Sequence, residues 1–290
     1  MSISVPALMG QLLIGLINGS FYALLSLGLA VIFGLLNIIN FTHGAQYMLG
    51  AFVAWFLLNK AGLGYGWALL LVPIVLAGVG ILIERLMLKH LYKLDHLYGL
   101  LLTFGLALML EGAFTQQFGS AGLPYNMPEK LTGGYNLGFM FLPTYRAWVI
   151  AASLVICLGT WFVIERTKLG SYLRAATENP SLVQAFGVRV PRMITLTYGF
   201  GVALAGLAGV FAAPIYQVSP QMGSSLIIVV FAVVVIGGMG SIMGSILTGF
   251  GLGIIEGLTK YFYPEASSTV IFIIMAIVLI VRPQGLFGQR

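Results

Sequence analysis

Few side chains in this sequence could do chemistry, and those few stand far apart. Two glutamates, Glu111 and Glu256, each lie late in a long apolar stretch, and the three histidines, His43, His90 and His96, are dispersed along the chain. The sequence contains no Gly-Lys-Ser/Thr, no His-Glu-x-x-His and no Gly-x-Ser-x-Gly, so a phosphate-binding loop, a zinc-protease helix and a nucleophile elbow are not indicated. We therefore expect no catalytic residue, no metal site and no cofactor in this chain.

The elements that carry these side chains are strongly apolar. Hydrophobic residues make up 59% of the 290 residues and charged residues only 8%, with a mean hydropathy of +1.01, whereas soluble domains carry about 25% charged residues. One bilayer crossing needs about 20 apolar residues. The composition thus predicts an all-α, polytopic transmembrane bundle of eight or nine spans, with residues 1–290 forming one domain. The predicted apolar segments are 9–36, 44–58, 66–83, 98–117, 147–164, 194–213, 225–236, 241–259 and 269–281.

The basic residues predict the orientation of the bundle, because cytoplasmic loops carry an excess of Lys and Arg. They gather in alternate loops and at the C-terminal end, and never form the run that would suggest nucleic-acid binding. The N-terminus is therefore expected outside and the C-terminus in the cytoplasm, which requires an odd number of crossings. The basic residues on the expected inner side are Arg85, Lys89, Lys93, Arg166, Lys168, Arg174, Arg189, Arg192, Arg282 and Arg290.

Glycine is the second unusual feature of the composition. The chain has 38 glycines, about twice the usual share of roughly 7%. Small residues let helix backbones approach closely in lipid, so their regular spacing predicts packing stripes rather than ligand loops. The predicted stripes are Gly15/Gly19, Gly201/Ala205/Gly209, Gly240/Gly244 and Gly249/Gly253/Gly257.

The segment 225–236 is too short for an ordinary crossing, since twelve residues rise only about 18 Å. A break at Gly237, Gly238 and Gly240 follows directly. Two interpretations stay open. The break lines a substrate path, because irregular backbone at membrane depth is tolerated beside a cavity, or it is a tight turn at the membrane face.

Two extramembrane loops are long enough to hold structure. The expected outer, periplasmic loop, 119–145, is rich in Pro and Gly and is predicted to be an irregular docking loop or cap. The inner loop, 166–193, is helix-permissive from Ser171 to Pro180, and a second short amphipathic helix should end at Gly187.

Polar residues within the apolar segments are candidates for the substrate pathway. Asn18 is one, because an amide in lipid seeks a partner or a water-filled cavity. A second group, Asn37, Asn40, His43 and Gln46, follows the first long segment. It lines the inner end of the path, or it is a turn in which Asn40 or Thr42 caps the next helix.

The acidic residues also allow two interpretations. Glu84 and Glu165 border basic sequence, and together with Glu111 and Glu256 they are most simply boundary anchors. A proton relay would instead need a pair of acids near mid-membrane, which only Glu111 and Glu256 could supply.

Several motifs resemble the permease subunits of bacterial branched-chain amino acid ABC importers, and urea and short-amide importers share the pattern. The resemblance covers essentially the whole chain. Its residues are the run Gly15 to Gly34, Asn40-Phe-Thr-His-Gly44, Met48-Leu-Gly-Ala51, Arg174-Ala-Ala-Thr-Glu-Asn179, Ala185-Phe-Gly187, Gly206-Leu-Ala-Gly209, Gly237-Gly-Met-Gly-Ser241 and Arg282-Pro-Gln-Gly-Leu-Phe287.

The resemblance implies a multi-pass permease of the bacterial inner membrane that works with partners. These are a second permease, identical or related, two cytoplasmic ATPases that bind the ATP and Mg, and a periplasmic binding protein. It further implies that the inner loop couples to the ATPase. A small face fits a groove there while Arg174 and Glu178 contact the surface, although Arg174 stands where a glutamate is usual. The small face comprises Ala175, Ala176, Ala185 and Gly187.

The expected function is translocation of branched-chain or related amino acids by alternating access, driven by ATP hydrolysis in the partner subunits. A urea or short-amide importer is the nearest alternative. An ion-coupled secondary transporter and a passive channel are the others.

Overall fold

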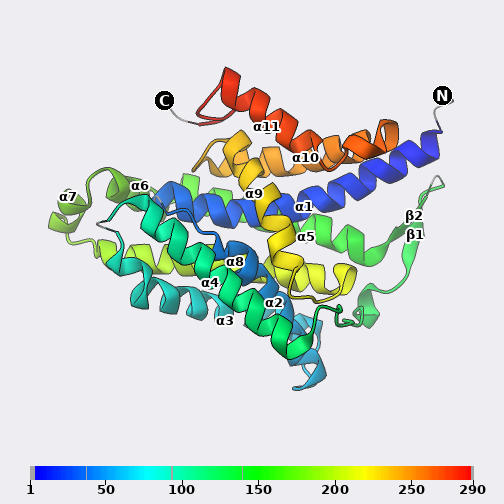
Figure 1. The fold of residues 1–290 in the computed structure, drawn as a ribbon, viewed down its shortest axis with the longest axis horizontal. Coiled ribbons are helices and arrows are strands. Elements are labelled where there is room, and N and C mark those ends of the chain that lie inside the picture. The colour runs from blue at the N-terminus through cyan, green and yellow to red at the C-terminus, as the bar shows by residue number, and fades with distance from the viewer. Residues whose placement is uncertain (1–3, 37, 93, 139, 289–290) are drawn as a thin grey trace. The chain divides into compact units, whose positions relative to one another are not determined.

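A computed structural model describes residues 4–36, 38–92, 94–138 and 140–288 of the chain. Asn37, Lys93 and Arg290, which the sequence arguments used, lie outside the described residues. Each predicted apolar segment is a helix, with ends that differ by a few residues from the prediction (Figure 1). These helices are α1 (Val5–Leu36), α2 (Thr42–Asn59), α3 (Tyr65–Leu86), α4 (His96–Phe118), α5 (Thr144–Arg166), α8 (Val190–Tyr216), α9 (Met222–Gly237), α10 (Ile242–Phe262) and α11 (Val270–Val281).

Six of the described helices are long and apolar enough to cross a membrane, namely α1, α3, α4, α5, α8 and α10. Helices α9 and α11, with 16 and 12 residues, are shorter. Helix α2 has 18 residues but carries Thr42, His43 and Gln46, which lower its hydropathy. The chain is thus a helical, multi-pass membrane protein, while the count of eight or nine spans and the orientation stay predictions.

The predicted outer loop is more regular than expected. It holds a 3-10 turn, Glu129–Leu131, and a hairpin of β1 (Gly134–Asn136) and β2 (Phe141–Pro143). The strands are antiparallel, with Tyr135 opposite Leu142, and Gly138 supplies the positive φ of 80° in the connection. The prediction of a wholly irregular loop was therefore wrong, because these prolines and glycines delimit a hairpin. Two further 3-10 turns are η1 (Leu88–His90) and η3 (Pro264–Ala266).

The chain divides into two compact units, which are treated separately below. The α10 unit comprises Met1–Ser26, Asn126–Leu158 and Ile228–Arg290, and the α8 unit comprises Leu27–Tyr125 and Gly159–Ile227. The single domain over residues 1–290 stays a prediction.

In the α8 unit, α8 packs against α2 and α3. The packing depends on glycine: a Cβ at Gly50 would lie 2.5 Å from the Gly206 Cα, and one at Gly209 would lie 2.7 Å from the Ala51 backbone nitrogen. Gly201 likewise approaches the Gly28 carbonyl oxygen, which a Cβ would meet at 2.8 Å. The predicted stripe on α8 is confirmed.

In the α10 unit, the N-terminal part of α1 crosses α10 through a second set of glycines. A Cβ at Gly253 would lie 2.5 Å from the Gly19 backbone nitrogen, and one at Gly249 would lie 2.5 Å from the Ala23 Cα. Gly257 meets the Gln11 carbonyl, so the two helices run antiparallel. The stripes predicted at Gly15/Gly19 and along α10 are confirmed.

The pair Gly240/Gly244 is the exception among the predicted stripes. Gly240 lies in the turn between α9 and α10, where Gly238 and Gly240 have φ angles of 101° and 89°. Such angles favour glycine, since other residues are strained there. The Ser241 hydroxyl accepts the Gly244 N–H at 3.1 Å and so caps α10. Gly240 is therefore a turn residue, and Gly244 packs against Gly237 instead.

The C-terminal segment completes this turn. The Leu286 N–H donates to the Ile236 carbonyl at 2.8 Å, and the Phe287 N–H donates to the Gly237 carbonyl at 3.1 Å. These carbonyls belong to the last turn of α9. Carbonyl groups in the last turn of a helix have no hydrogen-bond partner within that helix. The segment thus supplies donors that the helix end requires.

Replacing Gly253 with Ala should destabilise the protein by about 1 to 3 kcal/mol, the usual effect of overpacking a tight contact. The added methyl would overlap backbone atoms of α1. Gly251→Ala is the matched control on the same helix, since no described atom lies within 4 Å of the position that its Cβ would take. Thermal unfolding in detergent compares the two, and equal melting temperatures would contradict the role given to the glycine seam.

Candidate functional site

The inner loop forms two short helices, α6 (Lys168–Glu178) and α7 (Pro180–Ala185), between α5 and α8 (Figure 1). The Asn179 side chain caps α7 by accepting the Leu182 N–H at 3.0 Å, and Pro180 occupies the first position of α7, where its missing N–H is not needed. Gly187 follows with a φ of 84°. The predicted helix pair is confirmed, except that α6 begins at Lys168 rather than at Ser171.

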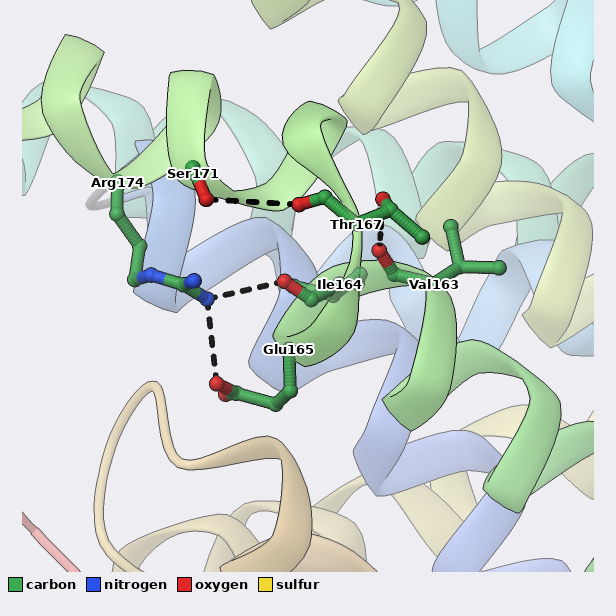
Figure 2. A network of polar contacts seen from close by, with 6 residues as sticks. All are labelled: Val163, Ile164, Glu165, Thr167, Ser171 and Arg174. Carbon is green, nitrogen blue, oxygen red and sulfur yellow. Dashed lines mark hydrogen bonds and ion pairs between the residues drawn. The ribbon is translucent and has the colours of Figure 1, made fainter.

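Arg174 fastens α6 to the end of α5. Its Nη1 donates to the Ile164 carbonyl at 3.0 Å and lies 3.2 Å from a Glu165 carboxylate oxygen, as Figure 2 shows. Carbonyls at a helix C-terminus are unpaired and attract cations. Hydroxyls of Thr167 and Ser171 extend the same network, the first to the Val163 carbonyl and the second to the Thr167 carbonyl (Figure 2). The guanidinium is thus turned toward α5, and its predicted contact with an ATPase stays a prediction.

The other face of the helix pair is apolar and exposed. Phe186 is 79% exposed, the second most exposed of the large apolar side chains in the described chain after Ile280. We name this face the α6–α7 surface and define it by Tyr172, Ala175, Leu182, Ala185 and Phe186, all of them exposed. Glu178 and Gly187 are exposed beside it.

Ala176 differs from the rest of the predicted small face. It is half-buried and lines a cavity of about 240 Å³ together with Leu173, Tyr92 and Pro180. The predicted set is therefore split between an outer surface and an inner cavity wall. Phe186 was missed as a candidate, although a large apolar residue between Ala185 and Gly187 in a polar loop was the available signal.

Three predicted pathway residues come together inside the α8 unit. Asn40, His43 and Gln46 are fully buried. The Asn40 amide donates to the Gln46 side-chain oxygen at 3.0 Å, and the Gln46 amide donates to the Tyr198 hydroxyl at 3.4 Å. His43 packs against Gly28, where a Cβ would lie 3.0 Å from its Nε2. These side chains form part of the core, and their pathway role stays a prediction.

Neither Asn40 nor Thr42 caps α2, so that prediction was wrong. Residue Phe41 occupies the cap position, and its N–H donates to the Thr103 hydroxyl at 3.2 Å. The Thr42 hydroxyl donates to the Thr103 carbonyl at 2.8 Å. Thr103 lies on α4, far away in sequence, and its position in an otherwise apolar run was the only signal of this role.

Glu84 is not a solvated boundary anchor. It is 2% exposed, and its two carboxylate oxygens accept hydrogen bonds from the hydroxyls of Tyr92 and Thr195, both at 2.7 Å. Burial and this hydrogen bond raise the pKa of Tyr92 above its usual range, so the phenol keeps its donor proton. Glu84 thereby joins the segment before α4 to the start of α8.

In the α10 unit, Asn18 finds its partner on α10. Its amide donates to Glu256 Oε1 at 3.4 Å, while the Tyr22 hydroxyl donates to Glu256 Oε2 at 2.7 Å. Glu111 belongs to the α8 unit, where it lines a cavity of about 60 Å³. The two acids of the suggested proton relay therefore do not form a pair within either unit. Among the residues that the structure describes, no group of three or more metal-binding side chains occurs.

Long apolar helices packed through glycine, with an amphipathic helix pair between two of them, define a multi-pass membrane permease. The chain belongs to the family described as "Branched-chain amino acid transport system / permease component", which matches residues 11–279. It is thus the permease component of an ABC transport system and is not itself an enzyme, which confirms the importer expected from the sequence.

Individual relatives cover nearly the whole chain. It is 29% identical to the high-affinity branched-chain amino acid transport system permease protein LivH of Escherichia coli K12, over 96% of this chain and 95% of LivH. It is 30% identical to the permease protein BraD of Pseudomonas aeruginosa, with the same coverage. The permease protein LivM of Escherichia coli is 29% identical over 91% of this chain and 67% of LivM. No solved structure matches the chain.

Replacing Tyr92 with Phe should lower stability by about 1 to 3 kcal/mol, because a buried carboxylate oxygen of Glu84 loses its donor. Tyr98→Phe is the matched control, since Tyr98 is 56% exposed on α4. Thermal unfolding of the purified protein measures both. A melting temperature for Tyr92→Phe as high as that of the control would show that Glu84 does not depend on this bond.

Proposed function

We propose that this chain forms one half of the translocation path of an inner-membrane importer and moves branched-chain amino acids by alternating access. Two cytoplasmic ATPases and a periplasmic binding protein complete the assembly. The second permease is of the LivM type, which the relatives support: LivH and LivM of Escherichia coli are both named as permeases of a high-affinity branched-chain amino acid system, and both resemble this chain.

The observation that carries this proposal is the α6–α7 surface. An exposed apolar patch on a segment between two apolar helices marks an interaction site, and a permease without a nucleotide-binding loop must receive work from a partner. Phe186, 79% exposed, is the anchor we assign to a pocket on the ATPase. Ala175 and Ala185 beside it allow close approach.

The contacts of α6 and α7 give a route for that work within the α8 unit. Arg174 holds α6 to the end of α5, and a Cβ at Gly170 would lie 2.5 Å from the Ile164 carbonyl carbon, so the two helices touch closely. Helix α7 leads directly into α8, which packs through glycine on α2 and α3. A displacement of the α6–α7 surface would therefore be passed to the core of the unit.

Replacing Phe186 with Ala should lower ATP-driven leucine uptake by at least tenfold in proteoliposomes that hold the complete complex. The exchange removes the buried anchor of the ATPase contact, and such anchors contribute about 2 kcal/mol or more. Phe262→Ala is the control, because Phe262 is 51% exposed and lies at the C-terminal end of α10, outside the α6–α7 surface. Excess urea should not lower leucine uptake, because the proposed substrates are branched-chain amino acids rather than urea. Uptake at the wild-type rate in Phe186→Ala would reject this surface as the ATPase contact.

We further propose the orientation expected from the basic residues, with the 119–145 loop periplasmic and the 166–193 loop cytoplasmic. Cys157, the single cysteine, is buried, so a Cys157→Ala background permits labelling at chosen sites. Glu129→Cys and Glu178→Cys both place a thiol at an exposed position.

A membrane-impermeant maleimide should label Glu129→Cys in intact right-side-out spheroplasts, and Glu178→Cys only after permeabilisation. The expectation follows from the excess of Lys and Arg beside Glu178. Labelling in the reverse order would invert the orientation without affecting the family assignment.

The proposed substrate pathway comprises polar residues within or between the apolar segments of the sequence, namely Asn18, Asn37, Asn40, His43 and Gln46. Polar groups at membrane depth commonly mark substrate paths. The hydrogen bond that the Asn40 amide donates to Gln46 supports a state in which this part of the path is closed. Movement of α8 would have to break the Gln46 bond to Tyr198.

A further inference from the structure

Glu256 is a carboxylate placed in a segment where a charge is expensive. It lies six residues before the end of α10, a helix long and apolar enough to cross the membrane. Its side chain is half-buried. Ionisable residues in such segments face protein or water rather than lipid and are functional candidates.

The hydrogen bonds at Glu256 come from two uncharged donors. Both carboxylate oxygens accept a donor, one from the Asn18 amide and the other from the Tyr22 hydroxyl. The Tyr22 contact, at 2.7 Å, has the usual length of an O–H···O hydrogen bond.

Glu256 forms no ion pair with any residue that the structure describes, and the nearest cation in sequence is Lys260, about one helical turn further along α10. No described Lys, Arg or His lies within the 4.0 Å that defines an ion pair with Glu256. A carboxylate offers about four acceptor positions, and Asn18 and Tyr22 each occupy one. The carboxylate of Glu256 therefore has acceptor positions that Asn18 and Tyr22 do not occupy.

Further unsatisfied polar atoms lie on the same two helices. Gln11 Oε1, Ser245 Oγ and Thr248 Oγ1 are buried and have no hydrogen-bond partner among the described residues. Gln11 lies two helical turns before Asn18 on the same face of α1, while Ser245 and Thr248 precede Glu256 on α10. Buried polar atoms are normally paired, so these three atoms are exceptions within the contact between α1 and α10.

We propose that Glu256 binds the α-ammonium group of the transported amino acid, with Tyr22 and Asn18 orienting the carboxylate. The inference rests on the proposed function, because a branched-chain amino acid has an apolar side chain and the ammonium is its single cation. In the proposed orientation the end of α10 lies outside. Glu256 then sits about 9 Å from that end, in the outer half of the path that a newly delivered substrate enters first.

The Glu256→Gln exchange tests the charge of the side chain without changing its shape. Glutamine keeps one acceptor oxygen and the size of the side chain, but it cannot pair with an ammonium group. In proteoliposomes with the complete complex, leucine uptake should fall at least tenfold. The ATPase activity stimulated by the liganded binding protein should stay within about twofold of wild type, because coupling lies elsewhere. Glu256→Asp should recover most of the uptake.

Glu111→Gln is the matched control, an acid-to-amide exchange in another apolar helix, and should leave uptake within about twofold. If wild type takes up leucine with ATP and Glu256→Gln does so equally well, the ammonium site is wrong while the proposed function stands. If wild type itself shows no ATP-driven uptake, the proposed function fails first. Uptake by wild type that an uncoupler abolishes at constant ATP would assign Glu256 to proton coupling and overturn the proposal.

If the Glu256→Gln variant does not assemble into the complex, leucine uptake by the Tyr22→Phe variant tests the proposal instead. This variant keeps the charge and removes one orienting hydrogen bond, so uptake should fall about threefold to tenfold. Wild-type uptake in an assembled Tyr22→Phe complex, together with inactive Glu256→Asp, would overturn the proposal.

Discussion

Close approach of helix backbones is the constraint on which this structure depends. In a bilayer, apolar side chains gain nothing by leaving lipid for protein, so helices associate through tight packing and hydrogen bonds. Both units meet this requirement with glycine. Gly50 and Gly206 bring α2 onto α8, and Gly19 and Gly253 bring α1 onto α10. The excess of glycine in the composition thus has a structural use at identifiable contacts.

Such tight seams leave little room for polar groups, and two acids among them have specific partners. Glu84 and Glu256 share one solution: a tyrosine hydroxyl binds one oxygen of the carboxylate, and a second uncharged donor binds the other. Yet the two acids differ in burial, since Glu84 is almost completely enclosed whereas Glu256 is half-buried. A similar pair of donors therefore serves an enclosed structural contact in the α8 unit and a half-buried acid in the α10 unit.

The sequence predicted what depends on periodicity and local residues. The apolar segments, the glycine stripes on α8 and α10, and the helix pair ending at Gly187 all follow from such patterns. The sequence could not predict pairings between distant segments. Thr103 on α4 accepts the N–H of Phe41 at the start of α2, and Glu84 binds a threonine on α8, because tertiary packing brings these residues together. Arg174 illustrates the same limit, since a basic residue in a loop does not reveal whether it points outward or toward a helix end.

The segment that completes the turn between α9 and α10 has a consequence for biogenesis. Leu286 and Phe287 supply the N–H groups that pair with the last carbonyls of α9, yet they are synthesised only after α10 and α11. During translation this corner stays incomplete until two further helices have been synthesised. A ribosome that stalls before Leu286 would release a protein whose α9 ends in carbonyls without donors, a local defect by which quality-control proteases could recognise truncated chains.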